Sequence, residues 1–319
     1  MAHYWALWLL VRVGGRVPLP VLDAIARAGG TLGWWVSRRI REVTRDHMRH
    51  VLGPKASSSA IDQAARECVR TTARGYAEFA HLPRLTPAIV RGAITAFDGL
   101  ELLLAARDAG NGAIVVSAHL GAPEVISHVA PAFDVPFMAL AEPLRPQRVH
   151  DFVQRVRAVP GVTYVAANLG GLREARAHLA AGGLLGMIAD RDVLGTGRPY
   201  AFFGERTLMP TGPVELSRRT GAPIFAVWVL REREAGRYHL VVRPVPLPAA
   251  TGDRSADVDS GMRTLIAEIE DGIRRAPGQW FPLVPIWSGL AVDRPDGERP
   301  DRAGPYNGAD DDRPDSPGS

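Results

Sequence analysis

The 319-residue chain contains a single cysteine, Cys68, and a single lysine, Lys55. One cysteine excludes an internal disulfide and any cysteine-based zinc site, and it indicates a fold completed in a reducing compartment. Arginine therefore carries nearly all the positive charge, as in the products of GC-rich genomes, and the formal net charge is +4. Because residues 291–319 hold eight acidic and four basic side chains, residues 1–290 carry +8. Such a cationic body suits an anionic partner.

The chain also lacks an uninterrupted apolar run of the length that a transmembrane helix needs, and its first residues do not predict a secretory signal. Its first apolar stretch, residues 4–11, ends at Arg12. Residues 1–50 nevertheless favour helices, with breaks expected at Gly14-Gly15, Pro18–Pro20 and Gly29-Gly30. They contain four tryptophans, a residue enriched at membrane–water interfaces. We expect amphipathic helices lying on an anionic membrane, the alternative being that the aromatic rings pack on the core. These tryptophans are Trp5, Trp8, Trp34 and Trp35.

Apolar runs and amphipathic segments alternate along the middle of the chain, after a helix predicted at 59–81. Alternation of this kind predicts an α/β fold, with a central, mostly parallel sheet flanked by helices. We expect one folded domain over 51–290, following the N-terminal helices of 1–50, and a disordered tail without a catalytic role over 291–319. The predicted strands cover 113–117, 137–141, 162–166, 184–189, 224–230 and 238–243, the last of them antiparallel to its predecessor. The predicted helices cover 122–130, 146–156, 171–181, 213–220 and 257–276.

His119 follows the predicted strand 113–117 directly, and Glu124 lies five positions further on. Gly121 permits a tight turn, and Pro123 suits the first turn of a helix. Open α/β sheets place reacting groups at such junctions, where a neutral imidazole can act as a general base. In the alternative, His119 is an ordinary loop residue and Glu124 only interacts with the helix dipole.

A second group of charged residues follows the strand predicted at 184–189. Asp190, Arg191 and Asp192 come at once, and a predicted loop then runs from 193 to 211. Loops of this length are more often functional than not. It offers arginines for anions, Glu205 and Asp190 for contact with an imidazole, and apolar residues for an acyl chain. Alternatively, the two aspartates cap the loop and its phenylalanines pack beneath it. The arginines are Arg191, Arg198 and Arg206, and the phenylalanines are Phe202 and Phe203.

Several other classes of protein lack their sequence signatures here. There is no Gly-x-Ser-x-Gly nucleophile elbow, no His-Glu-x-x-His, and no Gly-x-Gly-x-x-Gly between a first strand and helix. The histidines are scattered, so we expect no metal. Dispersed arginines without interleaved aromatics argue against nucleic acid as a partner.

The order of several motifs resembles the bacterial lipid A biosynthesis (lauroyl/myristoyl) acyltransferase superfamily. These motifs are His119 with Glu124, Asp190-Arg191-Asp192, Phe202-Phe203-Gly204-Glu205, 210–213, 219–223 and Ala276-Pro277-Gly278-Gln279-Trp280. The resemblance covers roughly residues 1–290. The Asp-Arg-Asp triplet and the glutamate after Phe-Phe-Gly look most like the actinobacterial phosphatidylinositol mannoside acyltransferases. The absence of arginines between Trp280 and Trp287, and of a clear transmembrane anchor, favours the same branch.

This resemblance implies transfer of a fatty acyl group from acyl-CoA to a sugar hydroxyl of a membrane glycolipid, without a metal or redox cofactor. His119 would be the general base, Glu205 its favoured direct partner, and Glu124 a structural or more distant member. Substrate would contact Asp190, Arg191, Asp192, Arg206, Phe202 and Phe203, with Arg191 on a phosphate. The expected location is peripheral, on the cytoplasmic face of the cell membrane. The alternatives are another acceptor, an acyl carrier protein donor, or a non-catalytic lipid-binding protein.

Overall fold

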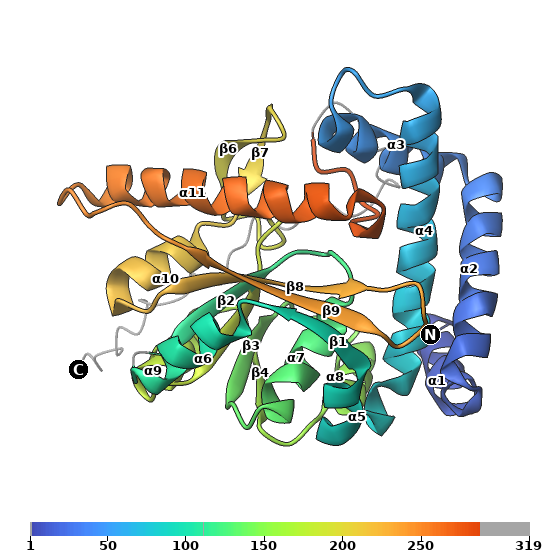
Figure 1. Ribbon diagram of the computed structural model, residues 1–319, viewed down its shortest axis with the longest axis horizontal. Coiled ribbons are helices and arrows are strands. Elements are labelled where there is room, and N and C mark those ends of the chain that lie inside the picture. Colours follow the sequence, from blue (N-terminus) through green and yellow to red (C-terminus); the bar gives the residue numbers. More distant parts are fainter. Residues whose placement is uncertain (1, 111, 288–319) are drawn as a thin grey trace, which may run out of the picture. The chain divides into compact units, whose positions relative to one another are not determined.

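The computed structural model describes residues 2–110 and 112–287. Its centre is a seven-stranded sheet in the order β1-β9-β8-β2-β5-β3-β4 (Figure 1). The pairs within β8-β2-β5-β3-β4 are parallel, whereas β9 is antiparallel to β8. The predicted α/β fold with a mostly parallel sheet is confirmed. The strands are β1 (Ile94–Asp98), β2 (Ala113–Ser117), β3 (Phe137–Ala141), β4 (Val162–Ala166), β5 (Leu184–Ile188), β8 (Ile224–Arg231) and β9 (Tyr238–Val245).

Two apolar layers sandwich this sheet. One contains Leu179, Val214 and Ile269, from the helices of one face, and the other contains Leu103 and Val129, from the helices of the opposite face. Both layers exclude water from the sheet, which stabilises the strands between them. The first face carries α9 (Leu169–Ala180), α10 (Gly212–Thr220) and α11 (Arg254–Arg275), and the second carries α5 (Pro87–Ala93), α6 (Leu100–Asp108) and α7 (Pro123–Ala132).

The N-terminal helices belong to the same compact unit as the rest of the described chain. They are α1 (Ala2–Arg12), α2 (Leu19–Val36), α3 (Arg38–Leu52) and α4 (Ser58–His81), with a turn of 3₁₀-helix at Gly14–Arg16. The helix α8 (Gln147–Arg157) also lies near them, because Phe152 packs with Tyr4 and Phe79. Two further turns of 3₁₀-helix lie at Leu82–Arg84 and Pro277–Gln279.

The expected break at Gly29-Gly30 is wrong, because α2 continues through both glycines. At Gly30 the helix approaches α4 so closely that a β-carbon would lie 2.9 Å from the Arg70 Cα. Glycine at this position therefore permits close helix packing instead of ending the helix.

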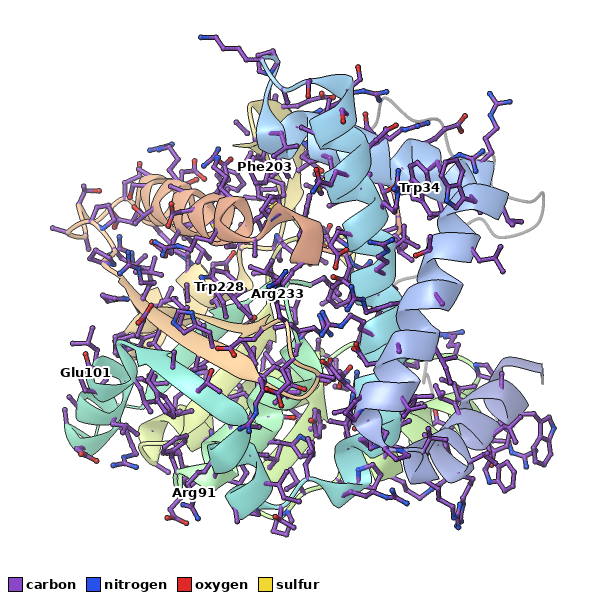
Figure 2. The ribbon with its side chains drawn as sticks, turned by 45° about the vertical axis from the view of Figure 1, so that its right-hand side comes forward. Trp34, Arg91, Glu101, Phe203, Trp228 and Arg233 are labelled. Carbon is purple, nitrogen blue, oxygen red and sulfur yellow. The ribbon has the colours of Figure 1, made fainter. Side chains whose placement is uncertain are left out.

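The tryptophans of this region divide between the two alternatives left open by the sequence. Trp34, near the end of α2 (Figure 2), is buried. The guanidinium groups of Arg45 and Arg66 lie over its ring, whereas Trp5 and Trp35 are 52% and 60% exposed. In the described part of the chain, no helix combines the length and apolarity that crossing a bilayer would require. The tail predicted at 291–319 lies outside the described residues.

The predicted loop 193–211 contains a hairpin instead, formed by β6 (Arg198–Phe202) and β7 (Glu205–Met209). Its two-residue turn consists of Phe203 and Gly204, with φ values of 49° and 84°. Positive φ at both positions matches the twist of a hairpin, but the usual residues are asparagine, aspartate and glycine. A phenylalanine at the first position concealed the turn in the sequence.

Candidate active site

His119 lies in a tight turn just beyond the carboxyl end of the central strand β2, as the sequence predicts. The His119 N–H donates to Asp190 Oδ2 at 3.0 Å, and the Phe281 N–H donates to the His119 carbonyl at 2.9 Å. Gly121, at φ +65°, donates its N–H to the Gln279 carbonyl. A β-carbon at Gly121 would lie 2.1 Å from the Val229 carbonyl oxygen. Only glycine therefore fits this turn, which backbone hydrogen bonds hold in place.

The direct partner of the His119 imidazole is Asp190, with 2.8 Å between Nδ1 and Oδ1. Asp190 follows β5, and β5 is the parallel neighbour of β2, with Ser117 opposite Ile188. Because the carboxyl ends of parallel neighbours meet at one edge of a sheet, the two side chains lie together. The indole N–H of Trp280 donates to the second carboxylate oxygen of Asp190 at 2.8 Å.

Asp190 is completely buried, yet it is held in its ionised form. Burial alone would raise the pKa of Asp190, but His119 and the indole of Trp280 outweigh it and hold the pKa below its ordinary value. An ionised carboxylate can only accept hydrogen bonds, so His119 Nδ1 must donate. In the neutral form of the ring, Nε2 then carries the lone pair that a general base requires.

His119 also lines a cavity of about 680 Å³. The volume lies within the range of small-molecule sites. Most of its wall is apolar and comes from β3, β5 and the segments that follow them. A cavity of this size and polarity is suited to an extended hydrocarbon chain ending at His119. The apolar wall includes Ala139, Leu140, Leu144, Leu172, Met187, Ile188 and Leu194.

Glu124 lines the same cavity but faces a different partner. It accepts hydrogen bonds from Arg157 of α8, at 2.7 Å from Arg157 Nε and from a second guanidinium nitrogen. The Arg157 guanidinium lies 5.8 Å from the centre of the Tyr164 ring. Glu124 therefore joins α7 to α8 beside the cavity, and the carboxylate that contacts the imidazole is that of Asp190.

The favoured assignment of Glu205 as the direct partner of His119 is wrong. The Glu205 carboxylate lies 2.8 Å from His50 Nε2, and the His50 ring stacks on Trp287 at 3.9 Å between ring centres. Glu205 begins β7 immediately after the hairpin turn, which directs it toward α3. Asp190 occupies the place expected for Glu205: it contacts His119 and does not line the cavity.

The other predicted binding residues divide into two groups. Arg191 and Asp192 do line the cavity: Arg191 is 3.8 Å from Glu142, and the carboxylate of Asp192 accepts the N–H groups of Gly195 and Gly197. Asp192 thus organises the loop, as the alternative interpretation proposed.

Phe202, Phe203 and Arg206 do not line the cavity. Phe202 is completely buried, and the ring centre of Phe203 lies 6.0 Å from that of Trp280. Arg206 borders a separate groove between the hairpin and α11. The structure therefore does not bring these three residues to the cavity beside His119, because the hairpin turns them away from it.

Trp280 belongs to the site, through its hydrogen bond to Asp190, although the sequence did not predict it. Its only signal was membership of the closing Pro-Gly-Gln-Trp motif, and 90 positions separate it from Asp190. Arg157 and Tyr164 gave no signal at all. Among residues 2–110 and 112–287, no group of three or more histidine, cysteine, aspartate or glutamate side chains could hold a metal ion.

Comparison with known proteins shows which family of proteins the chain belongs to. The chain belongs to the bacterial lipid A biosynthesis acyltransferase family, whose model matches residues 1–288. This membership identifies it as an acyltransferase of lipid biosynthesis. Among its relatives, the phosphatidylinositol mannoside acyltransferase of Mycolicibacterium smegmatis is 27% identical over 288 residues, 89% of this chain and 90% of the relative. A phosphatidylinositol mannoside acyltransferase of Mycobacterium tuberculosis is 26% identical over 253 residues, 77% of each chain.

Proposed function

We propose that the protein moves a fatty acyl group from acyl-CoA to a sugar hydroxyl of a membrane glycolipid, specifically a phosphatidylinositol mannoside. The observation that carries the proposal is the His119–Asp190 pair at the wall of an apolar cavity of about 680 Å³. The names of the two relatives support the acceptor. The cavity supports a long hydrocarbon chain on the donor.

In the proposed mechanism, the sugar hydroxyl attacks the thioester carbonyl carbon while His119 Nε2 accepts its proton. The new C–O bond forms a tetrahedral intermediate, and the C–S bond then breaks. The imidazolium of His119 returns the proton to the departing thiolate, so the products are an ester and free CoA thiol. Asp190 stabilises the imidazolium between these two transfers, as the buried acid does in catalytic triads. The reaction as written needs no metal or redox cofactor.

The exposed apolar side chains of α1 and α2 support peripheral membrane binding. In α1 and at the residue that follows it they recur at Trp5, Leu9 and Val13, and each is more than half exposed. In α2 they recur at helical spacing as well and are also more than half exposed. Apolar stripes at this spacing insert into the headgroup region of a bilayer. We place the protein on the cytoplasmic face of the membrane. The residues of the second stripe are Val21, Ile25, Leu32, Trp35 and Val36.

Vesicle flotation tests the membrane proposal. Deleting residues 1–45 would remove the packing of α2 on α4, so substitutions on the exposed stripe are the sharper perturbation. Ile25→Asp combined with Leu32→Asp should abolish flotation with phosphatidylcholine–phosphatidylglycerol vesicles. A matched double substitution that adds the same two charges elsewhere, Leu102→Asp with Ala105→Asp at exposed positions of α6, should leave flotation unchanged. Flotation retained by the Ile25/Leu32 variant would overturn the membrane proposal.

Thiol release from palmitoyl-CoA, with and without phosphatidylinositol mannosides, tests the proposed reaction. We expect release that the acceptor stimulates and that His119→Ala eliminates in folded protein. Release without any effect of acceptor would indicate a thioesterase or a different acceptor. Absence of release, with lipid binding intact, would favour an acyl carrier protein donor or a non-catalytic lipid-binding role.

A further inference from the structure

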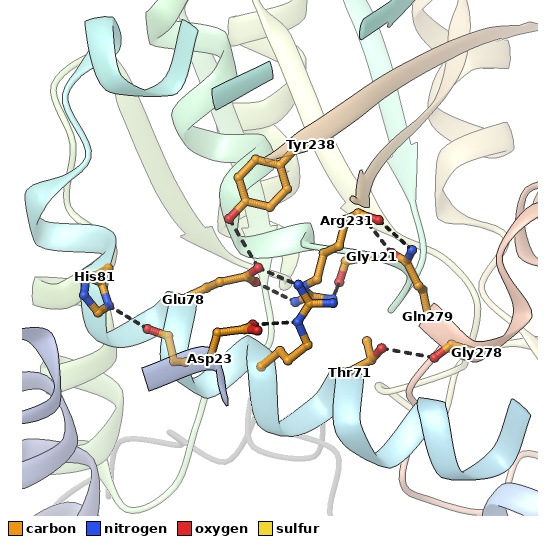
Figure 3. Close-up of polar contacts among 11 residues, drawn as sticks. Asp23, Thr71, Glu78, His81, Gly121, Arg231, Tyr238, Gly278 and Gln279 are labelled. Carbon is orange, nitrogen blue, oxygen red and sulfur yellow. Dashed lines mark hydrogen bonds and ion pairs between the residues drawn. The ribbon is translucent and has the colours of Figure 1, made fainter. Parts of the chain in front are cut away.

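A buried ionic network lies behind the turn that carries His119. Arg231 ends β8, and its side chain is only 1% exposed. Its guanidinium donates from Nε to Glu78 Oε1 at 2.8 Å and from a second nitrogen to Glu78 Oε2 at 2.6 Å. The hydroxyl of Tyr238 donates to the same carboxylate at 3.2 Å (Figure 3). Glu78 lies on α4, so the network joins the sheet to that helix.

The remaining guanidinium nitrogen of Arg231 points at the turn itself and donates to the carbonyl oxygen of Gly121 (Figure 3). Gln279 completes the arrangement from the other side. Its side-chain amide exchanges two hydrogen bonds with the backbone of Arg231, at 2.8 and 2.9 Å. The backbone carbonyl of Gln279 accepts the N–H of Gly121 at 3.0 Å. Both backbone polar groups of Gly121 are thus held by Arg231 and the residue clamped to it.

Stability alone does not account for a charged pair at this place. A buried ion pair loses its hydration, and apolar residues of similar volume often serve stability equally well. Burial by itself lowers the pKa of Arg231, and the Glu78 carboxylate more than offsets that effect, so the guanidinium stays charged. Its planar fork can bind a carboxylate with two N–H groups while a third group reaches a carbonyl. An apolar side chain or a lysine cannot make that combination.

We infer that Arg231 is a positioning residue for the proposed general base, fixing the Gly121 carbonyl two residues after His119 and so holding the imidazole against Asp190. The inference rests on the proposed role of His119. If the turn moves, the 2.8 Å contact between His119 Nδ1 and Asp190 Oδ1 is lengthened. A misplacement of about 1 Å at a reacting group can cost about 10²-fold in rate.

The helix that carries Glu78, α4, also carries a second buried ion pair, which provides a matched control. Arg74 of α4 donates to Asp23 at 2.6 Å, and the two side chains are 7% and 9% exposed. Among the described residues, this second buried ion pair has no hydrogen bond to the turn. Arg74→Met therefore removes a comparable buried pair without removing a contact to Gly121.

Single-turnover rates, KM and thermal midpoints of Arg231→Met, Arg231→Lys and Arg74→Met would test the inference. We expect Arg231→Met to lower kcat about 10²-fold with KM changed less than about threefold. Arg231→Lys should recover part of the rate. Arg74→Met should lose a similar amount of thermal stability while keeping kcat within about threefold of the wild type. Equal kcat losses in the Arg231→Met and Arg74→Met variants would overturn a positioning role.

Amide hydrogen exchange of residues 118–122 supplies a readout that does not depend on the reaction. Exchange there should accelerate in Arg231→Met and stay unchanged in Arg74→Met. If exchange accelerates as expected but His119→Ala is fully active, the proposed general base is wrong while the restraint on the turn stands. If Arg231→Met exchanges and reacts like the wild type, the inference is wrong. Should Arg231→Met fail to fold, Glu78→Gln replaces it in the same two measurements, kcat and amide exchange. This substitution weakens the hold on the guanidinium of Arg231 without removing the guanidinium, and the same outcomes support or overturn the inference.

Discussion

Replacing Asp190 with asparagine changes hydrogen bonding at His119 while preserving the shape of the side chain. The carboxylate accepts three N–H groups: His119 Nδ1 on one oxygen, and the His119 backbone and the Trp280 indole on the other. An asparagine has one oxygen and one NH₂ group. If its oxygen keeps the two donors at 3.0 and 2.8 Å, its NH₂ faces His119 Nδ1. The imidazole must then accept at Nδ1 and carry its proton on Nε2, which is the wrong tautomer for a base.

The expected loss follows from this reversal. A correctly placed general base contributes about 10²–10⁴-fold, and the same substitution in a serine-protease triad costs about 10⁴-fold in kcat. We therefore expect Asp190→Asn to lower kcat by about 10²–10⁴-fold with little change in KM. Acceptor-dependent thiol release from palmitoyl-CoA measures both quantities, and circular dichroism establishes that the variant is folded.

Glu205→Gln is the matched control, because the sequence favoured Glu205 for the same role. Its side chain is 49% exposed and contacts His50, so its kcat should stay within about threefold of the wild type. A folded Asp190→Asn variant with wild-type kcat would refute the assignment of the imidazole partner. A large loss in Glu205→Gln alone would restore the assignment that the geometry overturned.

Three further predictions concern His47, Gly121 and the cavity. Burial lowers the pKa of His47 to about 4, so the unfolded chain binds more protons below its ordinary pKa of 6.5. Stability should fall by ~3 kcal/mol between about pH 6.5 and pH 4, and this part of the pH dependence of urea unfolding should vanish in His47→Gln. Gly121→Ala should lower the thermal midpoint far more than Gly53→Ala, since both have positive φ but only Gly121 lacks space for a β-carbon; equal losses would contradict that reasoning. Ala139→Leu should lower kcat/KM for palmitoyl-CoA by about tenfold relative to octanoyl-CoA, and equal effects on the two donors would mean that the cavity does not hold the acyl chain.

Much of the fold could be predicted because its signals are local. The apolar runs at 113–117, 137–141 and 162–166 are β2, β3 and β4 with the predicted bounds. Each run is short and bounded by turn residues, so the pattern of neighbouring side chains suffices to define it. The strand β1 was missed because three of its five residues are exposed, which leaves no buried run to recognise.

The errors arose where a residue serves a distant contact. Gly30 lies inside a helix because α4 passes close to it, and Phe203 takes a positive φ in a turn packed against Trp280. Propensity describes what a residue favours in isolation, and tertiary contacts override it at such positions.

The candidate site shows the same division. The sequence by itself determined that a histidine follows a buried strand, that Gly121 forms the turn after it, and that Asp190 follows another buried strand. Only the tertiary structure decided which carboxylate meets the imidazole. The order of strands in the sheet places β5 beside β2 although two strands separate them along the chain, and the hairpin carries Glu205 away to His50. Strand order and hairpin direction depend on the packing of the whole chain, which no local spacing records.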